Sequence, residues 1–441
     1  MSKTFETLKG TYDYLPSEQS LRESIKDRLK DVFKRYGFLP AETPILSMLD
    51  LLTSKYSSDA DILNEIYKLS DQGKRELGLR YDLTICLTKL ISSNRGISLP
   101  FKRYEIGKVF RDGPVKLGRN REFTQCDVDV VGVSSILQEA EFMNLTHEAY
   151  SELGLEVEIR YNNRKILYGI IKSIFGEMSD ELLRSVVMLV DKLDKMTKEE
   201  LEREFIKFGL SSKSYDELYN SFSMSYEDLK AKYENSTSEI IKEGFLEMDE
   251  LRALTTSTPA WKSMLYAPYL ARGIDIYTGT VWEIFLKERN IGEHDFNLSL
   301  GGGGRYDNII TSFIDDGNIY PAVGMSFGLD VIYEVLKAKE GDEKKSDIDL
   351  FIIPLETKKD SFIFTQGLRT RGIKADIEKV DRRVKKSLNY ANKEHIPFVV
   401  IIGEDEVKNK MINIKDMTTG EETPFSLDDY KGICEFINKR L

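Results

Sequence analysis

The residues best suited to chemistry lie in one stretch, 110–132, which reads FRDGPVKLGRNREFTQCDVDVVG. Its first half places Arg111, Lys116, Arg119 and Arg121 around a Gly-Pro turn. Arginine forks bind phosphate oxygens bidentately, and glycine lets a backbone approach a ligand closely. The loop therefore favours polyphosphate, although a solvated hairpin with scattered charges accounts for the same residues.

The second half of this stretch alternates between polar and apolar side chains. The polar residues Gln125, Asp127 and Asp129 are set among the apolar residues Phe123, Cys126, Val128 and Val130. Alternation with a period of two predicts a strand. We expect Phe123, at the start of that strand, to be available for stacking on a base.

Three further stretches carry candidate residues, and each has a simpler explanation beside the functional one. In LGLRYDLTICLTK (77–89), Asp82 and Thr84 lie where a strand meets a helix, and a helix N-cap explains them. In LARGIDIYTGTVWEIF (270–285), Arg272 lies among small and apolar residues and needs either a salt-bridge partner or a phosphate. In GGGGRYD (301–307), four glycines permit close approach to a ligand, but taken alone they favour a flexible loop.

Composition bounds the class of protein that can hold these residues. The chain has 441 residues, a formal net charge of -11 and 41% hydrophobic residues, which is enough for two or three packed domains. The acidic balance argues against non-specific binding of nucleic acid but leaves room for a local basic surface. The three cysteines and three histidines are too scattered for a metal site or a disulfide framework. With no secretory signal and no apolar run of membrane-spanning length, we expect a cytoplasmic protein.

The elements that must position these side chains follow from the hydrophobic periodicity. Apolar residues spaced by three and four predict a helix over 17–37, with Ser17 as its N-cap. Residues 63–132 show short strands and turns, interrupted by a helix at 83–93. This order favours an α+β fold with an antiparallel sheet flanked by helices over a doubly wound fold.

The rest of the chain predicts an insertion and a second domain. Charged helical sequence over about 164–252 precedes further strands, which indicates a helical insertion within one domain, residues 1–338. A polar linker at 339–347 follows. Residues 348–441 then alternate strands and helices and predict a separate α/β domain. Its expected helices are 359–371, 382–394 and 427–440, and its expected strands are IDLFIIPL, KADIE, PFVVIIG and KMINIKDM.

Taken together and in this order, these stretches resemble one family over nearly the whole chain, the histidyl-tRNA synthetases of the class II aminoacyl-tRNA synthetases. YGFLPAETP (36–44) resembles the dimer-forming motif 1, the stretch from FR at 110–111 to REF at 121–123 resembles motif 2, and PAVGMSFGLD (321–330) resembles motif 3. ARGIDIYTG (271–279) and GGGGRYD resemble the two histidine-specific signatures. The resemblance implies a class II catalytic domain at 1–338 and an anticodon-binding domain at 348–441.

The resemblance also implies a reaction and its participants. The expected enzyme makes histidyl-adenylate from histidine and ATP and passes the histidyl group to the 3′ end of tRNA(His). It would act as a homodimer in the cytoplasm, with Mg²⁺ accompanying the ATP, no tightly bound metal, and no membrane or DNA partner. A basic run in the second domain, Arg382, Arg383, Lys385, Lys386 and Lys393, suits RNA phosphates, or else a solvated helix face.

Site residues carry over by match to the family's motifs. The catalytic residues are expected to be Arg111 and Arg272. The histidine-binding residues are expected to be Asp82, Thr84, Arg111, Gln125, Asp129, Arg272, Tyr277 and Tyr306, with Asp82 and Thr84 at the amino group and Asp129 and Tyr277 at the imidazole. The ATP-binding residues are expected to be Arg111, Arg121, Glu122, Phe123 and Arg272.

One departure from the family pattern keeps alternatives open. Motif 3 usually ends Gly-Leu-Glu-Arg, but here it ends Gly328-Leu329-Asp330-Val331, without the arginine that would hold ATP. This loss favours a synthetase-like regulatory subunit of ATP phosphoribosyltransferase, which does not charge tRNA, whereas the additional C-terminal domain argues against it. A histidine sensor, or a paralog that activates an amino acid for another acceptor, is the second alternative.

Overall fold

The computed structural model describes residues 5–54, 60–116, 118–193, 196–272, 276–340 and 346–440. Its contacts divide the chain into two compact units. Unit 1 comprises Met1–Asp13 and Arg22–Lys339, and unit 2 comprises Tyr14–Leu21 and Glu340–Leu441. Most of the predicted linker at 339–347 lies outside the described residues. Among those that are described, no helix is long and apolar enough to cross a bilayer.

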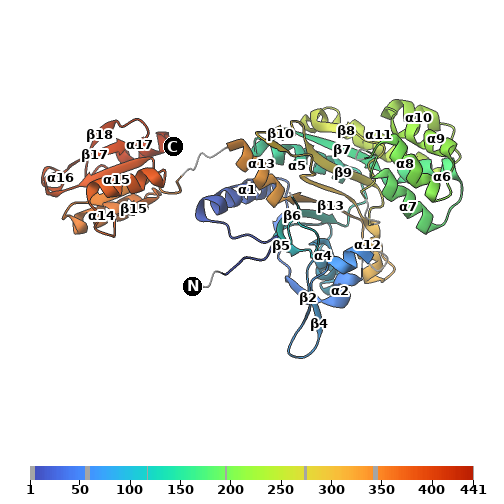
Figure 1. Ribbon diagram of the computed structural model, residues 1–441, viewed down its shortest axis with the longest axis horizontal. Coiled ribbons are helices and arrows are strands. Elements are labelled where there is room, and N and C mark those ends of the chain that lie inside the picture. The colour runs from blue at the N-terminus through green and yellow to red at the C-terminus, as the bar shows by residue number, and fades with distance from the viewer. Residues whose placement is uncertain are drawn as a thin grey trace. The chain divides into compact units, whose positions relative to one another are not determined.

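Unit 1 is built on an eight-stranded sheet (Figure 1). The strand order is β1 (Leu39–Pro40), β5 (Phe101–Phe110), β6 (Glu122–Val131), β13 (Ala322–Gly328), β12 (Gly301–Arg305), β9 (Thr280–Leu286), β7 (Val157–Asn163) and β8 (Met264–Tyr266). The prediction of an α+β fold is confirmed. The antiparallel pattern holds for the six central strands, but it was wrong for the outer pairs, because β1 pairs with β5 and β8 with β7 in parallel. Both outer strands are short segments that reach the sheet from distant parts of the chain, and parallel pairing requires such long connections.

Two long helices pack on one face of this sheet, and the polar side chains of β6 lie on the opposite face. Helix α1 (Pro16–Arg35) brings the Phe33 ring to 5.5 Å from that of Phe327 on β13. Helix α5 (Leu137–Glu152) brings the Tyr150 ring to 5.4 Å from the same phenylalanine. Because side chains alternate along a strand, Cys126, which pairs with Phe327, faces these helices, whereas its neighbours on β6 face the opposite side.

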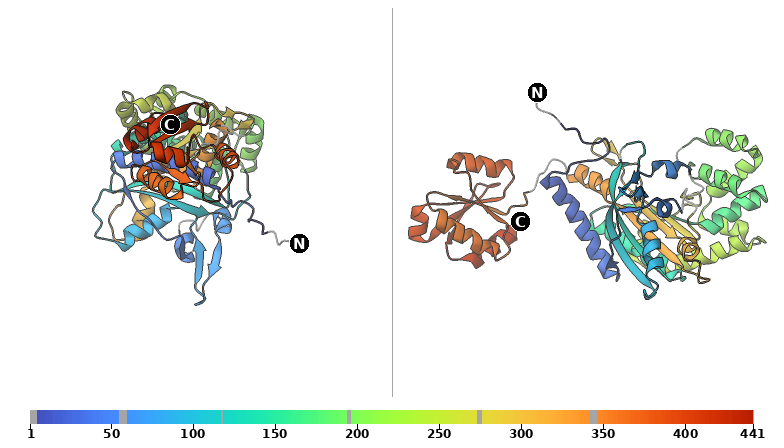
Figure 2. Two further views of the ribbon diagram at one scale, coloured as in Figure 1. Left: turned by 90° about the vertical axis from the view of Figure 1, so that its left-hand side faces the viewer. Right: turned by 90° about the horizontal axis from the view of Figure 1, so that it is seen from below.

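Shorter elements surround the polar face. A three-stranded sheet, in the order β2 (Leu46–Met48), β4 (Glu76–Leu79) and β3 (Lys68–Ser70), projects away from the main sheet (Figure 2). Helix α4 (Thr84–Ser93) follows β4 directly. The remaining short elements are α2 (Leu49–Thr53), α3 (Ala60–Glu65), β10 (Asn290–Ile291), β11 (His294–Asp295), α12 (Asp307–Ile314) and α13 (Leu329–Glu340).

A run of helices between β7 and β8 lies at one end of unit 1 (Figures 1 and 2). It begins after Asn163, whose side chain caps the first helix by accepting a hydrogen bond from the backbone N–H of Lys165. The helices are α6 (Arg164–Phe175), α7 (Asp180–Val190), α8 (Lys198–Lys207), α9 (Ser212–Phe222), α10 (Tyr226–Tyr233) and α11 (Glu239–Thr255), followed by the 3₁₀ helix η1 (Pro259–Ser263).

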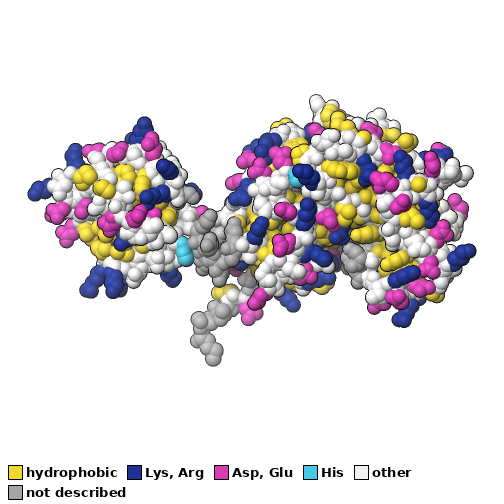
Figure 3. All heavy atoms as spheres, turned by 90° about the horizontal axis from the view of Figure 1, so that it is seen from above, with side chains coloured by type: hydrophobic (Ala, Val, Ile, Leu, Met, Phe, Trp, Pro, Cys, Tyr) yellow, Lys and Arg dark blue, Asp and Glu magenta, His cyan; other side chains and the backbone are white. Residues whose placement is uncertain are grey.

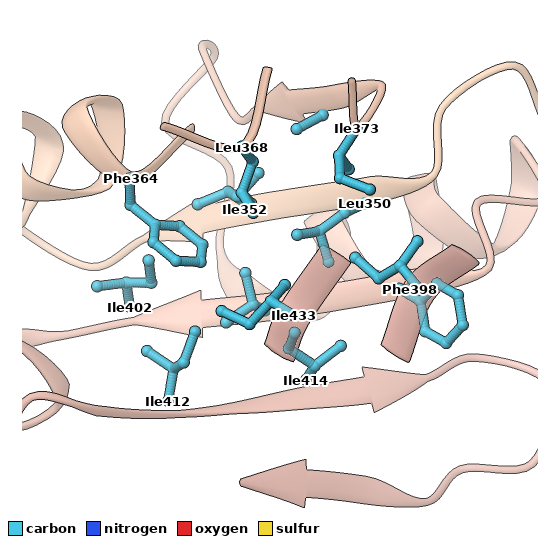
Figure 4. Close-up of a cluster of buried hydrophobic side chains, with 13 residues drawn as sticks. Leu350, Ile352, Phe364, Leu368, Ile373, Phe398, Ile402, Ile412, Ile414 and Ile433 are labelled. Carbon is cyan, nitrogen blue, oxygen red and sulfur yellow. The ribbon is translucent and has the colours of Figure 1, made fainter. Parts of the chain in front are cut away.

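Unit 2 is a five-stranded mixed sheet with helices. Its strand order is β15 (Ala375–Ile377), β14 (Leu350–Pro354), β16 (Phe398–Ile402), β17 (Met411–Asp416) and β18 (Glu422–Ser426). Leu350, Ile352, Phe364, Ile414 and Ile433 belong to its buried core (Figure 4). Its helices are α14 (Lys358–Arg369), α15 (Val384–Lys393), α16 (Glu404–Asn409) and α17 (Tyr430–Arg440). On the face shown in Figure 3, acidic and basic side chains are interspersed over both units.

The sequence prediction missed two elements of unit 2. Helix α16 spans only six residues, too few to show a helical period. Strand β18 is an edge strand that contains Pro424, and its residues, ETPFS, have little apolar character. Proline lacks the N–H that a central strand needs, so this sequence favours a loop unless a neighbouring strand such as β17 supports it.

Candidate active site

The polar face of the unit 1 sheet carries a cavity of about 290 Å³. All eight residues predicted to bind histidine line it: Asp82, Thr84, Arg111, Gln125, Asp129, Arg272, Tyr277 and Tyr306. They come from the start of α4, from the end of β5, from β6, from the loop before β9 and from the end of β12. The folded chain therefore brings together side chains that are up to 224 positions apart in the sequence, from Asp82 to Tyr306.

The glycines of GGGGRYD form a central strand, so the flexible-loop explanation was wrong. Strand β12 is held between β9 and β13, and each glycine faces a crowded site. A Cβ on Gly302 would lie 2.0 Å from Arg272 Nη1, and one on Gly304 would lie 2.6 Å from Tyr277 Cδ1. Glycine is needed here because two pocket side chains lie directly on the strand.

The deep end of the pocket is formed by a buried carboxylate with two partners. Asp129 Oδ2 accepts from Arg103, with Nε at 3.1 Å and Nη2 at 3.0 Å, and Oδ1 accepts from the Tyr306 hydroxyl at 2.5 Å. Burial raises the pKa of Asp129, while Arg103 and Tyr306 act to lower it. Across the sheet, Gly324 leaves room for this group, since a Cβ there would lie 2.1 Å from Asp129 Oδ1.

Behind Asp129 a buried ion network fixes the position of Arg103. The Arg103 side chain is fully buried, contacts Glu105 and donates to the backbone carbonyl of Leu83 at 3.0 Å. Glu105 also accepts from Arg80 Nη1 at 2.9 Å and from the Thr43 hydroxyl at 2.7 Å. Removing one partner from such a network leaves an uncompensated buried charge, so these side chains hold one arrangement.

The middle of the pocket carries polar atoms with unused bonding capacity. The Gln125 amide nitrogen donates to the Ser326 hydroxyl at 3.0 Å, and its carbonyl oxygen has no hydrogen-bond partner in the described part of the chain. The same holds for Oδ1 of Asp127, which lies between Gln125 and Asp129 along β6. Just before α4, Asp82 Oδ1 accepts from the backbone N–H of Ile85 at 3.0 Å. The N-cap position itself is Leu83, so the explanation of Asp82 or Thr84 as the N-cap residue was wrong.

Two arginines, Arg111 and Arg272, also line this pocket. The Arg111 guanidinium lies 4.3 Å from the centre of the Tyr81 ring and 4.9 Å from that of Phe123, and its buried Nε has no hydrogen-bond partner among the described residues. Arg272 adopts a left-handed backbone with φ of 44° and donates from Nη1 to the Trp282 carbonyl at 3.0 Å. Residues 273–275 of the signature, which include Asp275, lie outside the described residues.

The predicted ATP residues outside the pocket lie on the adjoining hairpin. Phe123 contacts Arg111, Arg121 Nε lies 3.5 Å from Asp112 Oδ1, and Glu122 pairs with Lys108. The residue that replaces the motif 3 arginine, Val331, packs against the hairpin loop. Val331 is buried, and Gly118 of the hairpin loop lies so close that a Cβ on it would be 3.3 Å from Val331 Cγ2.

Sequence reasoning missed several residues that build this pocket. Asp127, Ser326, Gly324 and Tyr81 line it, and Arg103 orients Asp129. The alternation of Gln125, Asp127 and Asp129 was a usable signal, because it places all three side chains on one face of the strand. The register of β5 and β13 against β6, which selects Arg103 and Ser326, was not available from the sequence.

Comparisons with known proteins agree over almost the whole chain. A family model described as Histidyl-tRNA synthetase matches residues 10–332, and one described as Anticodon binding domain matches residues 349–435. A Bacillus cereus protein named Histidine–tRNA ligase 1 is 46% identical over 420 residues, which are 94% of this chain and 96% of its own. The Histidine–tRNA ligase of Phocaeicola vulgatus is 34% identical over 462 residues, covering 97% of this chain and 98% of its own.

Solved structures give the same result for the fold. The crystal structure of histidyl-tRNA synthetase from Nostoc sp. PCC 7120 superposes with a TM-score of 0.86 at 28% identity and covers 100% of both chains. A Bacillus halodurans structure described as an ATP phosphoribosyltransferase regulatory subunit/histidyl-tRNA synthetase has a TM-score of 0.75 at 18% identity and covers 91% of this chain and 99% of its own. At that identity the second likeness concerns the fold alone.

Proposed function

The chain belongs to the histidyl-tRNA synthetase family, and from that premise we propose how its pocket joins histidine to tRNA. The enzyme is an aminoacyl-tRNA synthetase, a ligase that activates histidine with ATP. The observation that carries the residue assignment is the single cavity lined by both arginines and by the Asp129–Tyr306 pair. One end of it suits a phosphate and a carboxylate, and the other suits a ring with N–H groups.

The first step is attack of a histidine carboxylate oxygen on the α-phosphorus of ATP. The new bond joins the carboxylate oxygen to the α-phosphorus and forms a mixed anhydride. The bond between the α-phosphorus and the oxygen that bridges to the β-phosphate breaks, and pyrophosphate leaves with the electrons of that bond. Negative charge builds on the α-phosphate oxygens, and preorganised cations stabilise it. We assign this role to Arg111 and Arg272, which hold the two reactants in position without forming a covalent bond.

Histidine is selected by the deep end of the pocket. The Asp129 carboxylate, held by Arg103 and Tyr306, accepts from an imidazole N–H, and the Tyr277 hydroxyl faces the ring's other nitrogen. A site built to hydrogen-bond its substrate rejects an analogue without the matching groups by about 10⁴ or more. Asp82 and Thr84, with Gln125 nearby, receive the amino group.

ATP lies toward the hairpin loop, with Mg²⁺ accompanying its phosphates. Phe123 stacks on the adenine, and Arg121 and Glu122 contact the nucleotide. Val331 cannot supply the charge of the usual motif 3 arginine, so Arg111, Arg121 and Arg272 carry that function. The close packing of Gly118 on Val331 supports an apolar contact between the loop and motif 3 where other members have a cation.

The second step and the assembly involve the rest of the molecule. The histidyl group passes from the adenylate to a ribose hydroxyl at the 3′ end of tRNA(His), and AMP leaves. Unit 2, whose residues 349–435 match the anticodon-binding model, presents Arg383, Lys385 and Lys386 at its surface for RNA phosphates. The edge strand β1 and the adjoining exposed apolar residues support a homodimer.

Histidine-dependent ATP–pyrophosphate exchange tests the activation step. We expect exchange with histidine and not with the other amino acids. Replacing Arg272 by alanine should abolish exchange, because the charge on the α-phosphate loses its partner, while circular dichroism shows an intact fold. Absence of histidine-dependent exchange in the wild-type chain would overturn the activation step, and full exchange in Arg272→Ala would overturn the role of that arginine.

The regulatory-subunit alternative is not favoured. The relatives that match 94–97% of this chain at 34–46% identity are named histidine–tRNA ligases. The chain also keeps the residues matched by the anticodon-binding model, which a subunit that does not charge tRNA does not require.

A further inference from the structure

Asp127 lies on the floor of the active-site pocket and has no assigned task. It projects from β6 between Glu105 of β5 and Ser326 of β13, its partners in strand register. Only 4% of the residue is exposed, yet it lines the cavity, and its Oδ1 has no hydrogen-bond partner among the described residues. A buried carboxyl oxygen without a partner is costly and needs an explanation.

The cations around Asp127 are already engaged with other acids. Arg103 is shared by Asp129 and Glu105, and Arg80 pairs with Glu105. No ion pair to Asp127 is found within the described ranges, and its neighbour on the same face of β6 is a second acid, Asp129. Asp127 therefore leaves a carboxyl group on the pocket floor for a ligand cation to neutralise.

A ligand that neutralises Asp127 must bring a cation to the middle of the pocket. Histidine has three polar groups, of which the carboxylate would be repelled and the imidazole is received by Asp129 at the deep end. The remaining group, the α-ammonium, sits on the carbon between the other two. Asp127 likewise stands between Gln125 and Asp129, about 7 Å along the strand from each at about 3.4 Å per residue.

We infer that Asp127 binds the α-ammonium group of histidine together with Asp82, and that it is a substrate-binding residue of this pocket. The inference rests on the proposed function and adds a residue that the family's motifs did not supply. Amino acids present their ammonium to both acids, and a ligand without that group leaves Oδ1 of Asp127 without a hydrogen-bond partner among the described residues.

The charge state of Asp127 gives this assignment two measurable consequences. Burial and the neighbouring Asp129 raise the pKa of Asp127 well above its usual range, while Ser326 and Arg103 act to lower it. The charged and titratable groups that act on it are Asp82, Arg103, Asp129, Tyr277 and Tyr306. Binding of an ammonium group favours the ionised form of Asp127, so histidine affinity should rise with pH through the folded-state pKa.

The same pKa shift makes Asp127 a source of instability in the empty enzyme. The pKa of Asp127 is higher in the folded state than in the unfolded state. The stability of the folded chain is therefore greatest below the unfolded-state pKa and falls as pH rises through the folded-state pKa. At neutral pH, Asp127→Asn removes this cost and keeps the shape. The variant without ligand should therefore be no less stable than the wild type, unlike a variant of a structural residue.

Equilibrium binding of three ligands tests the inference. Histidine and histidinol carry the ammonium group, and 3-(imidazol-4-yl)propionate lacks it. We expect Asp127→Asn to weaken binding of the first two about ten- to hundredfold, as for other hydrogen bonds to charged groups. Binding of the propionate should be unchanged or tighter, and the melting temperature without ligand should not fall. The exposed Asp216→Asn, whose partner Lys198 lies on the helical insertion, is the matched control and should bind all three like the wild type.

Each alternative outcome contradicts the inference in a recognisable way. Equal weakening of all three ligands, or a lower melting temperature, would make Asp127 a structural residue. Unchanged binding of all three would give it no role. The three-ligand binding measurement tests the role of Asp127 even if no ATP–pyrophosphate exchange is observed. A wild-type enzyme without histidine-dependent exchange would instead refute the proposed function.

Discussion

Single glycines set how closely the substrate-binding side chains lie against the sheet. A Cβ on Gly324 would meet only side-chain atoms within its three nearest contacts, Asp129 Oδ1 at 2.1 Å, Asp129 Cγ at 2.9 Å and the Tyr306 hydroxyl at 3.1 Å. The methyl group of alanine would thus displace the Asp129–Tyr306 pair without striking backbone. Gly324 therefore shapes the proposed histidine site although it offers no functional group.

Gly324→Ala should therefore impair histidine recognition selectively. We expect the KM for histidine in pyrophosphate exchange to rise by about a hundredfold, since a displacement of about 1 Å has effects of that size, with the KM for ATP little changed. Gly96→Ala, at a site with nothing within 4 Å of the added carbon, should behave as the wild type. A similar rise in the KM for ATP would show that the substitution disturbs the whole pocket.

Among single residues, the sequence predicted those that match a family motif. It missed those that reach the pocket only through the register of neighbouring strands. All eight residues expected at histidine line one cavity. Asp127 stands two positions from Asp129 on the same face, and the alternation already showed this. Arg103 was not predictable, because its pairing with Asp129 follows from the alignment of β5 with β6.

Among the elements, α1, β6 and α13 meet at one buried ion pair. Arg22 of α1 contacts Asp330 at the start of α13 with Nη1 and Oδ1 at 2.9 Å. Asp330 Oδ2 accepts from the backbone N–H of Thr124 on β6 at 2.7 Å. The acid that motif 3 retains thus ties the hairpin strand to two helices, next to the position where the arginine is lost.

Arg22→Ala should destabilise unit 1 by about 3–5 kcal/mol, because it leaves Asp330 buried without its cation. Urea unfolding followed by tryptophan fluorescence measures this unit alone, since both tryptophans, Trp261 and Trp282, lie in it. Lys198→Ala breaks an exposed pair with Asp216 and should cost less than about 1 kcal/mol. Equal losses of unfolding free energy in the two variants would show that the buried Arg22–Asp330 pair contributes no more than the exposed pair.

Elements with a clear period were predictable, whereas those shaped by their neighbours were not. The helix expected at 83–93 is α4, Thr84–Ser93, because its apolar residues repeat at helical spacing. Strand β12 has four glycines and no pattern of side chains, so only its position between β9 and β13 makes it a strand. Strand β18 likewise depends on pairing with β17.

At the scale of the whole molecule, exposed apolar residues on and near β1 and β2 mark the surface where we expect two copies of the chain to associate. Leu39 of β1 is 69% exposed, and Leu46 and Met48 of β2 and the preceding Ile45 are also exposed. Large apolar residues exposed together mark an interaction surface, and β1 is an edge strand. We propose that a second copy of the chain covers them.

Sedimentation velocity should show a dimer for the wild type and a monomer for the double variant Leu39→Lys/Leu46→Lys, because two buried charges cannot be accommodated in the interface. Leu246→Lys places the same charge on the equally exposed Leu246 of the helical insertion and should leave the dimer intact. A wild-type monomer at micromolar concentration would refute the dimer.

The measurement that tests the central claim most directly is transfer of labelled histidine to tRNA by the wild-type chain. With ATP and Mg²⁺ present, we predict that the label becomes attached to the 3′ end of tRNA(His) and not to other tRNAs, and that transfer fails without ATP. Histidine-dependent pyrophosphate exchange without any labelled tRNA(His) would contradict the account, because the adenylate formed in the pocket would then serve another acceptor.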